Sequence, residues 1–300
     1  MNVEISILIA TRNRARALED CLRALSTQFA TGAAYEVIVV DDCSADHTSE
    51  LVEHFVRNGL LSVHLIRQAE PRGANAARNR GLEAARGEIV VFVDDDVLTP
   101  PGWLEILIAG LHRSCRPVIS GAVRLKAEGS LVGRHREEIR AYLGEILTPP
   151  ANLNGEVVPV LGNMAAFRWV FAKARFDETV RPPVEEVDWL RRAGVKAAFL
   201  PEAWVWHCKT GDELRLTRVL GGVWRRGSEG GWWMRERLQM PWSERLRLVR
   251  CGVITSARAF AHAAIRRCWG GVIVGLGELS QAMAVVGIIN RGHRQAESWR

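Results

Sequence analysis

Several signatures of common protein classes are missing from this sequence. Its six cysteines form no CxxC pair and follow no regular spacing, which argues against a disulfide framework or a zinc site and favours a reducing cytoplasm. No GxGxxG motif follows a predicted strand, so a dinucleotide-dependent oxidoreductase is not expected. The opening residues, MNVEISILIATRNR, contain no basic segment followed by a long apolar core. We therefore expect them to form a strand and not a signal peptide.

Uninterrupted hydrophobic runs of membrane-spanning length are also missing. Residues 252–265 and 269–290 are apolar helix candidates, and the second reaches the roughly 20 residues that a bilayer requires. Glu278 and Gln281 interrupt it, however, and Arg258 interrupts the first. A charge at the centre of a span costs about 2.5–3.5 kcal/mol. We expect two helices that lie at a membrane surface; a helical hairpin packed on the core is the alternative.

The composition is sufficient for a folded core, since 48% of the residues are hydrophobic and 25% are charged. The charge is unevenly distributed. The formal net charge is +6, but the region from Glu213 to the end contains 15 arginines, no lysine and six acidic residues. It also holds six of the eleven tryptophans. Arginine with tryptophan suits a membrane headgroup layer or an RNA surface. We predict two domains, residues 1–212 and 213–300.

Strand-like and helix-like segments alternate through the first hundred residues. The predicted strands are residues 3–10, 35–42, 61–66 and 87–95, and an alanine-rich helix is predicted over residues 73–86. The strands are apolar on both faces, as in a parallel sheet that is covered by helices. The sequence therefore predicts an α/β fold with a mostly parallel sheet and a helical C-terminal appendage. Ligands bind such sheets at the carboxyl ends of the strands.

Acidic residues follow two of these strands. Asp41 and Asp42 end the second strand, and Asp94, Asp95 and Asp96 end the fourth. Like charges about 4 Å apart repel by roughly 4 kcal/mol at a surface-like dielectric, so either their pKa values rise or a cation lies among them. If the strand geometry continues, Asp94 and Asp96 point the same way, which suits Mg²⁺ or Mn²⁺. The alternative is that these acids cap a loop or a helix.

Four segments occur in a characteristic order: SILIATRNR (6–14), VIVVDDCSADHT (37–48), GANAARNRGLEAARGEIVVFVDDDV (73–97) and PEAWVWH (201–207). Together they resemble the inverting, nucleotide-sugar-dependent glycosyltransferases of family two, whose fold is called GT-A. Each motif alone is weak, whereas the ordered set is specific. The resemblance implies a GT-A fold and a metal that bridges the diphosphate of the sugar donor.

The resemblance also implies which residues contact the donor. The nucleotide-sugar would be bound by Thr11, Arg12, Asn13, Asp41, Asp42, Gly73, Arg78, Asp94, Asp95, Gly162 and Asn163. The metal, Mg²⁺ or Mn²⁺, would be bound by Asp96, Asp94 and His207. From the residues alone, Arg78 also fits an ordinary surface arginine, and Gly162–Asn163 a plain turn.

The general base of this family is the second acid of an acidic pair that opens a helix ending in Ala-Gly. The corresponding stretch is VEEVDWLRRAG (184–194), in which Glu186 replaces the usual aspartate. Glu185 and Asp188 remain alternatives, since a helix macrodipole favours any acid in the first turn.

The sequence thus predicts a metal-dependent, inverting glycosyltransferase of the hexosyltransferase type. We expect a UDP-linked donor and a glycan or lipid-linked acceptor in cell-surface glycan or polysaccharide biosynthesis. We also expect a cytoplasmic location at the inner face of the membrane, and no nucleic-acid partner. The QxxRW signature of processive synthases is missing, which favours single or few additions. The alternatives are a nucleotidyltransferase on a related sheet and a non-catalytic carbohydrate- or RNA-binding protein.

Overall fold

The computed structural model describes residues 3–28, 34–59, 61–127, 140, 143–150, 155–266 and 269–285. Its strands are β1 (Ile5–Thr11), β2 (Tyr35–Asp41), β3 (Val63–Arg67), β4 (Ile89–Val93), β5 (Val97–Leu98), β6 (Val118–Ala127), β7 (Asn163–Phe167) and β8 (Ala197–Lys209). Its helices are α1 (Ala15–Ser26), α2 (Thr48–Arg57), α3 (Ala74–Ala84), α4 (Trp103–Arg113), α7 (Trp169–Lys173), α8 (Glu185–Ala193), the 3₁₀ helix η1 (Gly211–Leu214), α9 (Leu216–Glu236), α10 (Trp242–Arg266) and α11 (Trp269–Val285).

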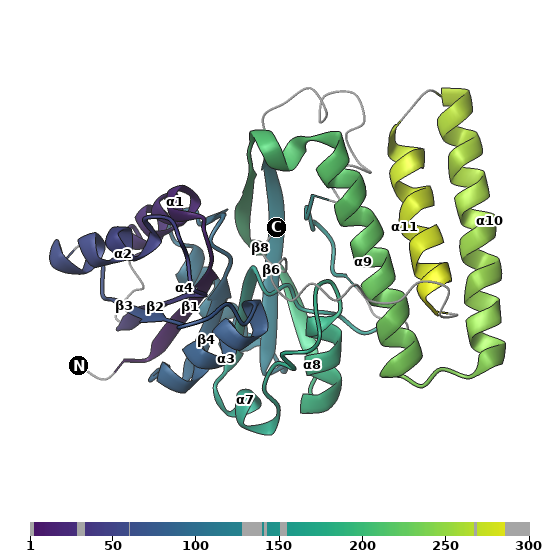
Figure 1. Cartoon of the computed structure of the whole chain (residues 1–300). Helices are drawn as coiled ribbons and strands as arrows, with labels where there is room; N and C mark the ends of the chain where they lie inside the picture. Colours follow the sequence, from purple (N-terminus) through teal and green to yellow (C-terminus); the bar gives the residue numbers. More distant parts are fainter. Residues whose placement is uncertain are drawn as a thin grey trace.

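The strands form one eight-stranded sheet in the order β3-β2-β1-β4-β7-β6-β8-β5 (Figure 1). Strands β1 to β4 are parallel, as predicted. The other half is mixed, because β7 runs antiparallel to β4 and β6, and β5 runs antiparallel to β8. The predicted α/β class and the flanking helices are confirmed.

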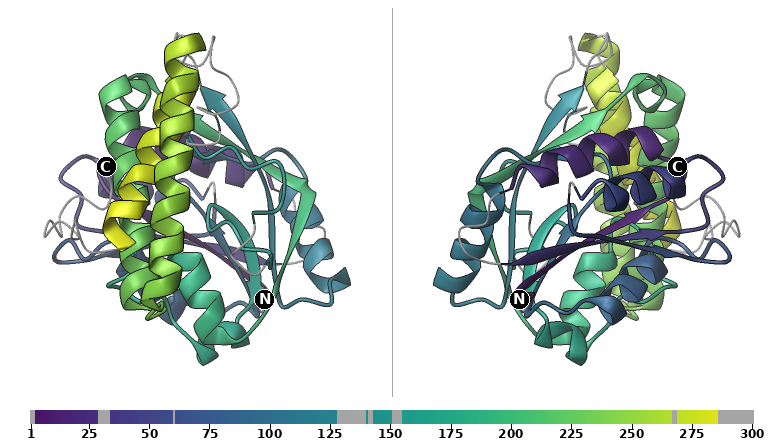
Figure 2. Two further views of the ribbon diagram at one scale, coloured as in Figure 1. Left: turned by 90° about the vertical axis from the view of Figure 1, so that its right-hand side faces the viewer. Right: turned by 90° about the vertical axis from the view of Figure 1, so that its left-hand side faces the viewer.

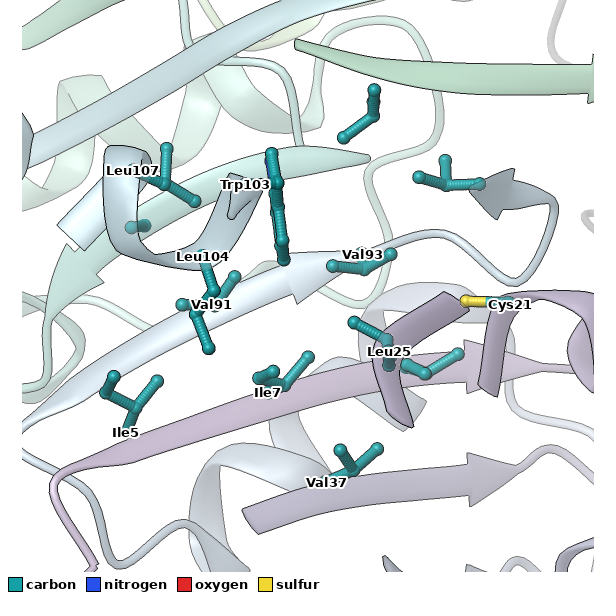
Figure 3. Close-up of a cluster of buried hydrophobic side chains, with 14 of the residues drawn as sticks. Ile5, Ile7, Cys21, Leu25, Val37, Val91, Val93, Trp103, Leu104 and Leu107 are labelled. Atoms are coloured by element: carbon teal, nitrogen blue, oxygen red, sulfur yellow. The ribbon is translucent and has the colours of Figure 1, made fainter. Parts of the chain in front are cut away.

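Helices cover both faces of the sheet because the buried strands carry apolar side chains on both sides. Alternate residues of β1 divide between the two faces: Ile5, Ile7 and Ile9 pack under α1, α2 and α4, whereas Leu8 packs under α3. Figure 3 shows the first of these clusters, with Trp103 standing between α4 and the end of β4. Both faces are closed, so the edge at the carboxyl ends of the strands is the place that remains for a ligand.

Two boundaries differ from the prediction in a way that affects the site. Strand β4 ends at Val93, so Asp94, Asp95 and Asp96 lie in the turn that leads to β5. Helix α3 begins after Gly73, whose φ of 93° a residue with a side chain rarely adopts.

The helix predicted over 252–265 is part of the longer α10. Of the helix predicted over 269–290, residues 286–290 lie outside the described part of the chain.

The last three helices form a layer beside the sheet, in which α11 packs between α9 and α10 (Figure 1). The predicted domain boundary near residue 212 falls inside η1 and stays a prediction. Within the described ranges, no helix is both long enough and apolar enough to cross a bilayer.

Candidate active site at the carboxyl edge of the sheet

The three aspartates after β4 do not alternate as the sequence predicts. Asp95 and Asp96 are buried and share Arg14 as a partner, at 3.1 Å and 2.8 Å. Asp94 is half exposed and faces Arg78 at 3.6 Å. The expectation that Asp94 and Asp96 point the same way is therefore wrong, because the strand ends at Val93 and the acids follow a turn.

Asp96 is the centre of a charged cluster. Its Oδ2 accepts hydrogen bonds from Arg14 Nη2 at 2.8 Å and Lys209 Nζ at 2.6 Å, and it lies 3.1 Å from His207 Nε2. Pairing of β5 with β8 places His207 opposite Val97 and so brings it beside Asp96. Burial opposes ionisation of Asp96, but the charges of His207, Lys209 and Arg14 hold its pKa well below its usual range.

Asp95 is hydrogen-bonded to Thr11, a residue that was predicted to contact the nucleotide. The Thr11 hydroxyl is fully buried and donates a hydrogen bond to Asp95 Oδ2 at 2.7 Å. Burial raises the pKa of Asp95 to about 7, against the effect of the Arg14 guanidinium. Both side chains thus fix the turn after β4 to the end of β1, and the Thr11 hydroxyl is bonded to Asp95.

Asp96 and His207 provide a carboxylate and an imidazole side by side. The carboxylate suits Mg²⁺ and Mn²⁺, whereas the imidazole suits a transition-metal ion such as Mn²⁺ better than Mg²⁺. Among the described residues, no group of three or more His, Cys, Asp or Glu side chains could hold a metal. Such ions commonly use one or two protein ligands and complete their shell with substrate phosphates and water. The residues therefore fit an ion held by Asp96 and His207 together with a diphosphate. Asp94 is not part of that set.

The acids after β2 shape the neighbouring loops. Asp41 accepts hydrogen bonds from the Ser44 backbone and the Ser49 hydroxyl. Asp42 accepts hydrogen bonds from the backbone N–H groups of Arg72 and Gly73, at 2.7 Å and 2.9 Å. These bonds tie the start of α3 to the end of β2 and hold Gly73 in its positive-φ conformation.

Asn13 joins the loops after β1 and β2. Its backbone N–H donates to Ser44 Oγ at 2.8 Å, and its side-chain oxygen accepts from the Ala45 backbone at 2.7 Å. Arg12 is half buried beside it. Together with Asp41 and Asp42, these residues place the two loops at one corner of the carboxyl edge.

Arg78 of α3 connects Asp94 to the acids of α8. Its guanidinium is largely buried and lies 3.6 Å from Asp94 and 3.8 Å from Glu185. Gly162 closes the other side of Asp94, since a Cβ at this position would lie only 2.7 Å from Asp94 Oδ2. A glycine here thus lets the backbone approach the carboxylate closely.

Asn163 is a structural residue, which corrects its predicted role in binding the donor. It is fully buried. Its side-chain oxygen accepts from Trp103 Nε1 at 2.9 Å, and its amide donates to the carbonyls of Ala122 and Ala203. These carbonyls lie where the register between β6 and β8 shifts. Asn163 therefore supplies the hydrogen bonds that the strand ladder lacks there.

The three acids of α8 have different surroundings. Asp188 is buried, pairs with Arg192 at 2.7 Å and accepts a hydrogen bond from Trp233 of α9. These bonds make it a tether between helices and unsuited to be the base. Glu185 is buried beside Arg78, and burial raises its pKa well above the usual value.

Glu186 is partly exposed, whereas Glu185 and Asp188 are buried. Burial raises its pKa to about 7, although Arg78 and a hydrogen bond from the Leu161 backbone favour the charged form. The Leu161 bond places Glu186 next to the Gly162 segment and hence near Asp94. A carboxylate with a pKa near 7 is well matched to proton transfer at neutral pH.

Arg14, Lys209 and Glu213 also belong to the site, although the sequence did not predict them. Glu213 of η1 lies 3.2 Å from Arg14 and 3.1 Å from Lys209, so the start of the C-terminal region completes the charged cluster. Side chains two residues apart on a strand share a face, so His207 on a strand end already implied that Lys209 lies beside it. Arg14 has no comparable signal, since a basic residue before a helix is usually solvated.

The comparisons with known proteins agree with this architecture. A family model for glycosyl transferase family 2 matches residues 6–174, which is more than half of the chain. Glycosyltransferase AglE of Haloferax volcanii is 35% identical over 119 residues, which is 40% of this chain and 39% of that protein. A GalNAc(5)-diNAcBac-PP-undecaprenol beta-1,3-glucosyltransferase of Campylobacter jejuni is 29% identical over 128 residues, 43% of this chain and 40% of the relative. The chain thus spans less than half the length of these curated relatives.

Two solved structures share the fold. The mannosyltransferase PcManGT from Pyrobaculum calidifontis, solved in complex with GDP-Man and Mn²⁺, superposes with a TM-score of 0.67 at 17% identity, over 95% of this chain and 87% of that one. Residues 1–349 of Staphylococcus aureus TarS in complex with UDP superpose with a TM-score of 0.54 at 16% identity, over 95% and 91% of the two chains. These likenesses support the GT-A fold.

Proposed function

The chain belongs to glycosyl transferase family 2, and from this we propose that it transfers a sugar from a nucleoside-diphosphate sugar to an acceptor hydroxyl with inversion. The observation that carries the proposal is the position of Glu186. It is a partly exposed carboxyl with a pKa near 7 at the same edge of the sheet as Asp94 and Asp96. That arrangement supplies a base on one side and a charged phosphate-binding region on the other.

In the proposed reaction, Glu186 removes the proton from the acceptor hydroxyl as the hydroxyl oxygen attacks the anomeric carbon. The bond between that carbon and the diphosphate oxygen breaks, and the nucleoside diphosphate leaves with the electron pair. One displacement from the opposite face inverts the anomeric configuration. Arg78 lies between Asp94 and Glu185, so it reduces the repulsion between these carboxylates and an incoming diphosphate.

We propose that Asp96 and His207 hold a divalent ion once a diphosphate is present, as their donor types suggest. The ion would act as a Lewis acid on the leaving group. The Mn²⁺ of the mannosyltransferase complex supports this proposal. Arg14 and Lys209 would keep Asp96 charge-compensated before donor and ion arrive.

The nucleotide and the acceptor are proposed from the relatives. The ligands of the structural relatives are UDP, UDP-GlcNAc and GDP-Man, so a uridine or guanosine diphosphate sugar is the proposed donor. The Campylobacter relative acts on an undecaprenol-linked glycan, and the TarS proteins of Staphylococcus aureus are poly(ribitol-phosphate) glycosyltransferases. We propose a cell-surface glycan or lipid-linked acceptor.

The direct test is a thermal-shift screen of UDP- and GDP-sugars with and without Mn²⁺. We expect one nucleotide class to raise the melting temperature, and the shift to grow with the ion. The proposed function would be rejected if no nucleotide-sugar stabilises the protein in either condition.

A further inference from the structure

The outer side of α10 presents large apolar side chains to solvent. Trp242 is 61% exposed, Leu246 59%, Val253 48% and Ile254 42%. The spacing from Trp242 to Leu246 and Val253 is four and eleven residues, which places all three on one face of an α-helix. Monomeric proteins rarely expose large apolar patches, and those that occur commonly mark protein or membrane interaction sites.

An adjacent side of α10 packs on the protein. A Cβ added to Gly252 would lie 3.1 Å from the Ala282 side chain of α11, and Ser256 Oγ donates to the Gly275 carbonyl at 3.0 Å. Small residues thus bring α10 close to α11, while the bulky apolar residues face outward. Figure 2 shows α10 as the outermost element of the C-terminal layer, in front in the left-hand view.

Arginines accompany the exposed apolar residues. Arg247, Arg250 and Arg258 are all exposed on α10, and the exposed acid at its start is Glu244. The region from Glu213 to the end carries nine more basic than acidic residues. A helix with an apolar stripe, a tryptophan and flanking arginines fits the boundary between lipid headgroups and acyl chains. The excess positive charge selects a negatively charged surface.

We propose that the outer face of α10, formed by Trp242, Leu246, Arg247, Arg250, Val253 and Ile254, docks on an anionic lipid bilayer. The helix lies in the plane of the interface, with its apolar residues among the acyl chains and its arginines at the lipid phosphates. This surface lies outside the catalytic edge, and the proposal does not depend on the transfer reaction.

The test uses the full-length protein and co-sedimentation with two kinds of vesicle, phosphatidylcholine alone and phosphatidylcholine mixed with phosphatidylglycerol. Two double variants are compared with the wild type: Leu246→Glu with Val253→Glu, and Arg247→Glu with Arg250→Glu. The control is Val56→Glu, because Val56 is 48% exposed on α2, away from α10. Thermal melts establish that all four proteins are folded.

We expect the wild type and the Val56 variant to bind the mixed vesicles, less strongly as salt is added. Each double variant should bind at least about tenfold more weakly. Each arginine near an anionic surface contributes roughly a fivefold factor, and a glutamate at Leu246 or Val253 removes apolar area that the interface would bury and adds a charge that the anionic lipids repel. Wild-type binding to neither vesicle, or equal binding by wild type and both double variants, would overturn the proposal. A different result would assign this face to a second copy of the chain: the wild type binds no vesicles but forms a concentration-dependent dimer, and the Leu246/Val253 variant does not form that dimer.

Discussion

Lys209 Nζ lies 2.6 Å from Asp96 Oδ2, so the carboxylate expected to bind a metal is already paired with a permanent cation. Arg14 contacts the same oxygen. A divalent ion at Asp96 must therefore compete with two basic side chains. Lysine is the more easily displaced of the two, because its ammonium sits on a flexible stem and makes no bidentate contact.

The first prediction concerns this competition. Replacing Lys209 by Met removes the charge while keeping most of the apolar stem. We expect Lys209→Met to bind Mn²⁺ at least about tenfold more tightly in the presence of nucleoside diphosphate, because the ion no longer displaces an ammonium that lies 2.6 Å from Asp96 Oδ2. Titration calorimetry measures the change. Lys196→Met, which removes an exposed lysine paired with Glu156, is the control. If Lys209→Met and Lys196→Met bind Mn²⁺ with equal affinity, the ion binds at a site other than Asp96.

The second prediction separates the acids of α8. Glu186→Gln should abolish transfer while nucleotide binding survives, because only the proton acceptor is lost. Asp188→Asn should instead lower the melting temperature through its weakened bonds to Arg192 and Trp233, with transfer by the folded protein retained. Product assays and thermal melts on both variants check this. If Glu185→Gln stops transfer and Glu186→Gln does not, the base has been assigned to the wrong residue.

The third prediction is the pH dependence of transfer. The base must be deprotonated to accept a proton, and burial raises the pKa of Glu186 to about 7. The rate should therefore fall as the pH drops below about 7 and level off above it. Because the pKa of Glu186 is higher in the folded than in the unfolded protein, the folded state loses free energy of unfolding as the pH rises above the ordinary pKa of a glutamate. Glu186→Gln should accordingly melt at a higher temperature than the wild type at pH 8. A flat rate profile between pH 5 and 8 would contradict the assignment.

The fourth prediction concerns Asn163. Asn163→Ala leaves the Trp103 indole N–H and the carbonyls of Ala122 and Ala203 without this partner inside the core. Each unsatisfied buried group costs about 1–3 kcal/mol, so we expect a loss of at least about 3 kcal/mol in the free energy of unfolding. Denaturant unfolding measures it. Asn58→Ala, at the exposed end of α2, should change stability by about 0.5 kcal/mol or less. A matching small effect at both positions would contradict the structural role of Asn163.

The fold of the first half follows from local signals. Apolar strands and an alanine-rich helix predict β1 to β4 and α3, because each segment is consistent with its neighbours in a parallel sheet. The second half departs from that pattern because β7 and β5 run antiparallel. Their direction depends on contacts between residues more than 40 positions apart, such as Val93 with Asn163.

The sequence predicts which edge of the sheet holds the site, but not which side chains contact one another there. The positions of Asp41, Asp42 and Asp94 at the carboxyl ends follow from where the strands end. The different surroundings of Asp94 and Asp96 do not follow from the sequence, since a single turn residue decides which way each carboxylate points. The pairing of Arg14 with Glu213 spans almost 200 residues, and nothing local indicates it.

The central claim is that the edge bearing Asp96 and Glu186 cleaves a nucleotide-sugar. The most direct measurement is hydrolysis of UDP- and GDP-sugars with Mn²⁺, in which water takes the place of the acceptor hydroxyl and nucleoside diphosphate is released, by the wild type, Asp96→Asn and Glu186→Gln. The account predicts release by the wild type from one nucleotide class and a fall of at least about a hundredfold in each variant. Undiminished release by both variants would contradict it.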